Sequence, residues 1–147
     1  MPGCDMSSRF LNDTVTLFNY AGEDSTLETP VYEKTVISKC CLFASNGASA
    51  DRKPSDGAKL YLFHNKTVCK SSSGDNKTYV DYETWNAMTS ENKALHWTIG
   101  ETGDDFIVAG ASNASVPPTN GKSHRITSFK ELKKGSKNMW HFEVMCK

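Results

Sequence analysis

The sequence predicts a mainly β protein, a small β-barrel or sandwich with long loops and one short helix. Its apolar residues occur in short runs, most of which alternate with a period of two, as in strands. Clusters of Gly, Ser, Asn, Thr and Asp separate these runs, and hydrophobic residues make up only 37% of the chain. At 147 residues one hydrophobic core is sufficient, so we expect a single β-rich domain over residues 13–147. Residues 1–12 lack apolar periodicity and are expected to form a flexible N-terminal arm.

Two strands are expected in the N-terminal third. Residues 14–20 alternate with apolar side chains on both faces, which indicates a strand buried on both sides. The polar stretch 21–30 reads as a hairpin loop, and residues 31–43 form the second strand. That run is long enough to bend or bulge, and we expect this near residues 38–40.

The central third alternates between polar loops and short strands. Residues 44–57 contain no large apolar side chain and are expected to be an exposed loop. A strand over residues 58–63 follows, then a second polar loop over residues 70–77 and a short strand over residues 78–80.

One convincing helix follows the short strand. Asp81 can accept a hydrogen bond from a backbone N–H as the N-cap. The spacing of Tyr82, Trp85 and Met88 places all three side chains on one face of the helix.

The C-terminal third contains two expected strand pairs. Residues 95–99 and 105–109 flank a Gly- and Asp-containing turn, which predicts a hairpin or tight corner with exposed acids. Residues 112–121 contain two consecutive prolines, Pro117 and Pro118, and are expected to be a loop. After this loop, residues 122–129 and 138–146 are expected to form a closing hairpin. Between them, Ser128 and Glu131 could instead form the capping box of a helical turn, and the sequence leaves both possibilities open.

Charge and targeting signals narrow the function classes. Lys plus Arg and Asp plus Glu both number 17, which disfavours bulk binding to nucleic acid or an acidic membrane surface. The sequence shows neither a signal peptide nor an apolar stretch long enough to cross a membrane, so we expect folding in the cytosol and no membrane partner. The five cysteines contain no CxxC motif and are expected to be free thiols that pack as small apolar residues.

No catalytic signature is visible, so the sequence predicts neither an enzyme nor a cofactor. A glycine-flanked serine elbow, a phosphate loop and an EF-hand ladder are all missing. The four histidines have no ligand spacing, which predicts no metal site, although one assembled only in three dimensions stays open. Adjacent Cys40 and Cys41 point to opposite faces of a strand and suit neither one metal nor a disulfide.

The densest positive region is a cluster of lysines near the C-terminus. It could face the phosphates of DNA or contact a protein partner, and we favour the alternative of a solvated hairpin tip. The cluster consists of Lys130, Lys133, Lys134 and Lys137. The three tryptophans fall within ordered apolar runs, which favours core or interface positions over a base-stacking platform.

Three segments together resemble small head-completion, or neck, proteins of tailed bacteriophages that infect Gram-positive bacteria. They are FLNDTVTLFNY at residues 10–20, HWTIGETGDDFIVAG at 96–110, and RITSF with GSKNMWHFEV between 125 and 144. The layout is also similar to that of head-closure, or stopper, proteins, from which the loop at 71–77 and the two prolines depart. The resemblance implies a virion protein of the neck, made in the host bacterial cytoplasm.

The resemblance also implies partners and a role. It implies a homo-oligomeric ring below the portal and adaptor that closes the head, retains the packaged DNA in passive contact, and presents the tail attachment surface. Loop 44–57 is expected to line or gate the channel, with candidate residues Ser45, Asn46, Gly47, Asp51, Arg52 and Lys53. The alternatives are a tail-side or capsid-decorating structural protein and a host-directed protein-binding module.

Overall fold

The computed structural model of the protein describes residues 11–26, 28–44, 57–100, 104–118 and 123–147. Its largest sheet begins with a long antiparallel hairpin of β1 (Asp13–Asp24) and β2 (Thr29–Ala44). The other strands of this sheet are β3 (Ala58–Phe63), β4 (Val68–Lys70), β7 (Phe106–Ala109), β8 (Ser123–Leu132) and β9 (His141–Cys146). The prediction of a mainly β protein is confirmed.

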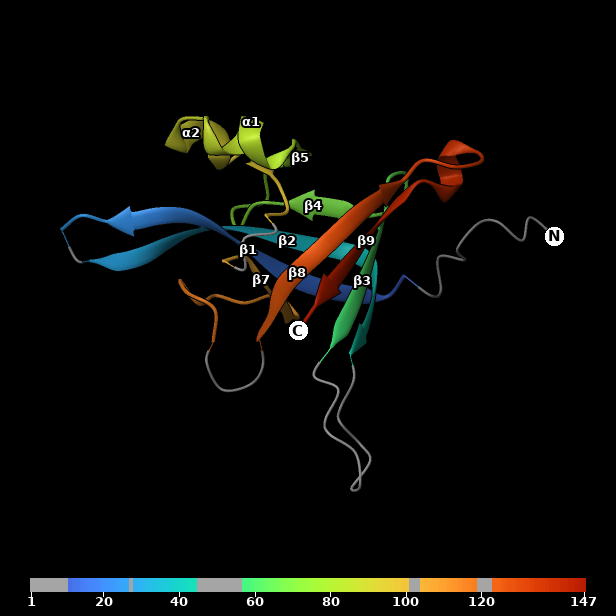
Figure 1. Ribbon diagram of the computed structural model, residues 1–147, viewed down its shortest axis with the longest axis horizontal. Helices are drawn as coiled ribbons and strands as arrows, with labels where there is room; N and C mark the ends of the chain where they lie inside the picture. Colours follow the sequence, from blue (N-terminus) through green and yellow to red (C-terminus); the bar gives the residue numbers. More distant parts are fainter. Residues whose placement is uncertain (1–10, 27, 45–56, 101–103, 119–122) are drawn as a thin grey trace, which may run out of the picture.

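The strand pairings form a closed ring. The order runs β1, β7, β8, β9, β3, β2, and β2 pairs again with β1 (Figure 1). All of these pairs are antiparallel, and the short β4 adds to β2 beside the ring. Closure matters because it satisfies the backbone hydrogen bonds that an open sheet would leave at its edges.

The core lies inside this ring. One face of each strand supplies aliphatic side chains that fill the interior, as the period of two requires. Those exposed by 2% or less include Val15, Leu17, Ile37, Leu60, Ile107, Ile126 and Val144. The expected burial of β1 on both faces is also confirmed, because Thr16 and Phe18 are fully buried on its other face.

A second, smaller cluster lies on the outer face of β2 and β3. It consists of Leu11, Cys41 and Phe63, with Tyr61 packed against it, whereas Cys40 belongs to the main core. The two adjacent cysteines therefore point to opposite faces, as predicted. Residues 1–10 of the predicted arm lie outside the described residues, and Leu11 is only 4% exposed.

The predicted bulge in β2 is confirmed. Asp13 pairs with Cys40 and Thr14 with Ser38, which leaves Lys39 as the extra residue, with φ of 55°. The bulge lets β2 change partners, from β4 at residues 36–38 to β3 at residues 41–44.

Two short helices lie together beside the ring (Figure 1). Asp81 caps α1 (Tyr82–Asn86) by accepting from the backbone N–H of Thr84 at 3.1 Å, as predicted. Trp85 is fully buried, and its indole N–H donates to the carbonyl of His96 at 3.1 Å. A second helix, α2 (Ser90–Lys93), follows beyond the single helix expected. Among the described residues no helix is long and apolar enough to cross a membrane.

Of the two alternatives expected for residues 95–99 and 105–109, a hairpin or a tight corner, the hairpin is wrong. β6 (His96–Trp97) instead pairs in parallel with β5 (Thr78–Tyr79), while β7 pairs with β1 and β8. The acid at the end of this turn points inward, so the expectation of exposed acids is wrong for Asp105, which is 2% exposed. The pairing of β6 and β7 with strands distant in the sequence therefore outweighs the local preference for a hairpin turn.

The closing hairpin of β8 and β9 is confirmed, and it settles the alternative at Ser128. Residues 128–132 continue β8, so the capping-box helix does not form. A single 3-10 turn, η2 (Lys137–Met139), lies at the tip, where Gly135 adopts φ of 76°.

Candidate functional site: an aromatic pocket beside a lysine-rich hairpin tip

A pocket of about 270 Å³ opens where β3, β4, β5, β6 and β9 meet. Its walls are mainly aromatic and aliphatic, and they bring together residues from five segments of the chain. These are Leu62, Phe63, His64, Thr67, Cys69, Lys77, Thr78, Tyr79, Trp97 and Phe142.

The aromatic side of the pocket is built around Phe142. The strand register places Phe142 opposite Leu62, and the parallel pair β5 and β6 places Tyr79 beside Trp97. The ring of Tyr79 lies 4.7 Å from that of Phe142 and 5.0 Å from that of Trp97. The imidazole of His64 stacks on Phe142 with 4.8 Å between ring centres. These faces offer flat apolar surfaces to an inserted group.

The polar side of the pocket holds a buried amine and a thiol. Lys77 is 7% exposed, and its Nζ donates to the backbone carbonyl of Lys34 at 3.0 Å. Burial lowers the pKa of Lys77 to about 8, although the nearby Glu33 carboxylate opposes this shift. Burial raises the pKa of the Cys69 thiol to about 12, so this sulfur stays protonated at neutral pH. The amine can therefore lose its proton far more readily than a surface lysine.

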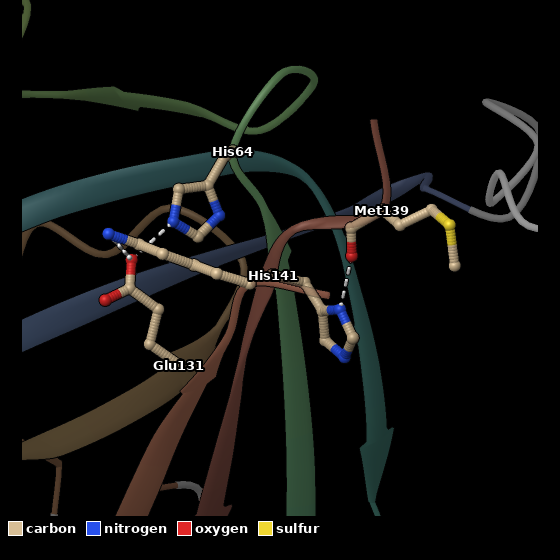
Figure 2. Close-up of polar contacts among 5 residues, drawn as sticks. His64, Glu131, Met139 and His141 are labelled. Atoms are coloured by element: carbon tan, nitrogen blue, oxygen red, sulfur yellow. Dashed lines mark hydrogen bonds and ion pairs between the residues drawn. The ribbon is translucent and has the colours of Figure 1, made fainter. Parts of the chain in front are cut away.

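At the rim of the pocket, His64 bonds to Glu131. Its Nε2 lies 2.6 Å from Oε2 of Glu131, and Nζ of Lys133 lies 3.8 Å from the same oxygen. Figure 2 shows the ring of His64 directed at Glu131, whereas His141 is directed at the carbonyl of Met139. The two histidines thus face different partners, and His141 reaches a separate carboxylate, Glu143, at 3.0 Å. Within the described ranges no group of three His, Cys, Asp or Glu side chains could hold a metal ion.

The predicted basic cluster lies at the tip of the β8–β9 hairpin, beside this rim. The ammonium groups of Lys133 and Lys137 lie 5.5 and 5.9 Å from the ring centre of Trp140. Lys130 lies 4.0 Å from the carboxylate of Glu143, and Lys134 is exposed. The tip therefore combines positive charge with a half-buried indole, a composition common at protein interfaces.

The six candidate residues of the predicted gating loop lie outside the described residues. Sequence reasoning missed Cys69, Lys77 and Tyr79, which flank or end a polar loop and show no periodic pattern. Only the pairing of β4 with β2 and of β5 with β6 brings them together.

The fold and this site define a small β protein with a closed ring of strands and a pocket at one end. A family of unknown function, DUF6751, matches residues 10–147, and the chain belongs to that family. No curated protein and no solved structure matches the chain.

Proposed function

We propose that this chain is a structural virion protein of the bacteriophage neck. In this role copies form a ring below the portal and adaptor, which closes the head, retains the DNA and provides the surface for tail attachment. It acts by assembly, without catalysis or a cofactor.

The observation that carries the proposal is where the three segments of the resemblance lie in the fold. Residues 10–20 contain residues 13–20 of β1, and residues 96–110 contain β6 and β7. The third segment, residues 125–129 and 135–144, lies in β8, the hairpin tip and β9. All of these strands except β6 are consecutive neighbours in the ring, in the order β1, β7, β8, β9. Apart from β6, the strands that carry the similarity to head-completion proteins therefore lie in one contiguous part of the strand ring.

The shape of the molecule also supports an assembly role. The β1–β2 hairpin and the β8–β9 hairpin extend beyond the strand ring at opposite ends (Figure 1). Projecting hairpins present side chains and backbone edges to neighbours, which is how β subunits commonly associate.

Immunoelectron microscopy tests the proposal directly. An antibody raised against the chain is applied to phage particles from the source lysate, with pre-immune serum as the control. Label at the junction of head and tail is the expected result. Label on the capsid surface or along the tail would favour the capsid-decorating or tail-side alternative. Intact particles without label would reject a virion role and favour a host-directed binding module, which a pull-down from host extract would then examine.

A further inference from the structure

The distal part of the β1–β2 hairpin is a two-stranded ribbon. β1 pairs with β7 only over residues 15–18, and β2 pairs with β4 only over residues 36–38. Within the part of the chain that the structure describes, residues 19–24 and 29–33 pair in a ladder only with each other. Isolated two-stranded ribbons are marginally stable, and their outer edges carry backbone groups that can pair with another chain.

The ribbon is acidic and partly apolar. Residues 20–33 contain four acids, Glu23, Asp24, Glu28 and Glu33, and neither Lys nor Arg, a formal charge of −4. Tyr20 and Tyr32 pair across the strands with 5.7 Å between ring centres, and Val31 is 38% exposed. Such a surface fits a partner that offers both positive charge and apolar contact.

The β8–β9 tip has the complementary character. Residues 130–137 contain four lysines and one glutamate, a formal charge of +3. The ring of His64 links this tip to the pocket, because it lies 6.2 Å from Trp140 and also lines the cavity. The cavity of about 270 Å³ is below the range of roughly 300–1,000 Å³ that holds drug-sized ligands, and its size suits an inserted side chain.

The two surfaces cannot meet within one molecule, because they lie at opposite ends of it (Figure 1). We infer that the acidic β1–β2 ribbon of one copy binds the lysine-rich β8–β9 tip and the adjoining aromatic pocket of the next copy. This contact joins two different patches, so it is heterologous and repeats head to tail until it closes into a ring. The inference rests on the proposed function, since it supplies the contact from which the neck ring is built.

Charge-reversed variants of the full-length chain test the contact. The ribbon variant carries Glu23→Lys and Glu28→Lys, and the tip variant carries Lys134→Glu and Lys137→Glu. All four side chains are exposed. The matched control carries Glu83→Lys and Glu91→Lys on the two helices, which changes the net charge as much as the ribbon variant does. Association is measured by sedimentation velocity at low and high salt, and thermal melts establish that each variant is folded.

The wild-type chain is expected to associate at low salt and to dissociate as salt is raised. The substitutions change the formal charge of the ribbon from −4 to 0 in one variant and that of the tip from +3 to −1 in the other. Each variant should associate about a hundredfold or more weakly, because its contact no longer joins opposite charges. The helix control should behave as wild type. Mixing the two variants should restore association as one-to-one pairs, since the unchanged ribbon of the tip variant can still bind the unchanged tip of the ribbon variant.

Several results would overturn the inference. They are a wild-type chain that stays monomeric at high concentration and low salt, reversed variants that associate as wild type does, and a mixture that fails to recover. Retention of each variant on immobilised duplex DNA distinguishes the other possible partner of the lysines. If the tip variant alone is retained less than the wild-type chain while its self-association is unchanged, the lysines contact DNA instead. Label at the head–tail junction together with any of these results would leave the proposed function standing and reject this contact alone.

Discussion

Replacing Asp105 with alanine should destabilise the fold more than its position in a surface turn suggests. Its carboxylate is 2% exposed and accepts three hydrogen bonds. The backbone N–H of Tyr20 donates at 2.9 Å, Nδ2 of Asn19 at 2.8 Å, and the backbone N–H of Gly100 at 2.9 Å. These donors come from β1 and from the segment after β6, so this carboxylate ties the turn to the ring.

The magnitude follows from the donors that the substitution leaves without a partner. Each bond to a charged acceptor contributes roughly 1.5–3 kcal/mol, and a buried donor left unpaired costs about 1–3 kcal/mol. Asn19 keeps a second bond, from the same Nδ2 to the carbonyl of Thr98 at 2.8 Å, which limits its loss. Burial also raises the pKa of Asp105, so part of the bonding offsets the desolvation of the charge. We therefore expect the free energy of unfolding to fall by about 3–5 kcal/mol.

Urea unfolding followed by tryptophan fluorescence measures this loss, because Trp85 and Trp97 are both buried. The matched control is Glu91→Ala, which removes an exposed acid on α2 and should change the free energy by about 0.5 kcal/mol or less. A loss below about 1 kcal/mol for Asp105→Ala would refute the reasoning, because even one orphaned donor should cost that much.

Three other predictions concern the pocket, the thiols and the loop. The folded-state pKa of Lys77 falls from 10.5 to about 8, so the unfolded chain binds more protons between these values, and this group adds stability as pH rises through that window. Lys77→Met removes the cost of burying this charge and also the hydrogen bond to the carbonyl of Lys34, so the free energy of unfolding at pH 7 should rise by a net amount of about 2 kcal/mol. Urea unfolding should show that this gain in stability becomes smaller by pH 10. Burial raises the pKa of three thiols to about 12, those of Cys40, Cys69 and Cys146. Iodoacetamide labelling followed by mass spectrometry should therefore find these thiols protected in the native protein and reactive in urea. If the neck proposal holds, particles that carry a deletion of residues 45–53 should leak DNA, which nuclease sensitivity measures, and tight particles would contradict the gating role.

Much of the local structure was predictable because it depends on neighbouring residues. Alternation over residues 14–20 and 58–63 predicts strands, and Asp81 predicts the start of a helix through a bond to Thr84 only three residues away. The bulge near Lys39 could also be placed, since a run of that length must bend to change partners.

The pairing partners were not predictable in the same way. β5 and β6 pair in parallel across two helices, and β7 pairs with residues of β1 that lie 88 to 94 positions earlier in the chain. A hairpin between residues 95–99 and 105–109 satisfied every local rule, yet the wider sheet offered β7 two antiparallel partners instead. Local pattern cannot weigh such competing non-local contacts, because their free energies depend on the complete set of pairings.

The sequence by itself determined the mainly β class, the exposed lysines at the closing hairpin and the opposed faces of Cys40 and Cys41. Only the tertiary structure decided that Asp105 is buried and that Lys77 lies in an aromatic pocket. The physical reason is that the alternation of residues along a strand shows which face of the strand is apolar. The partner of a buried polar group, in contrast, comes from chain segments that meet only when the ring closes.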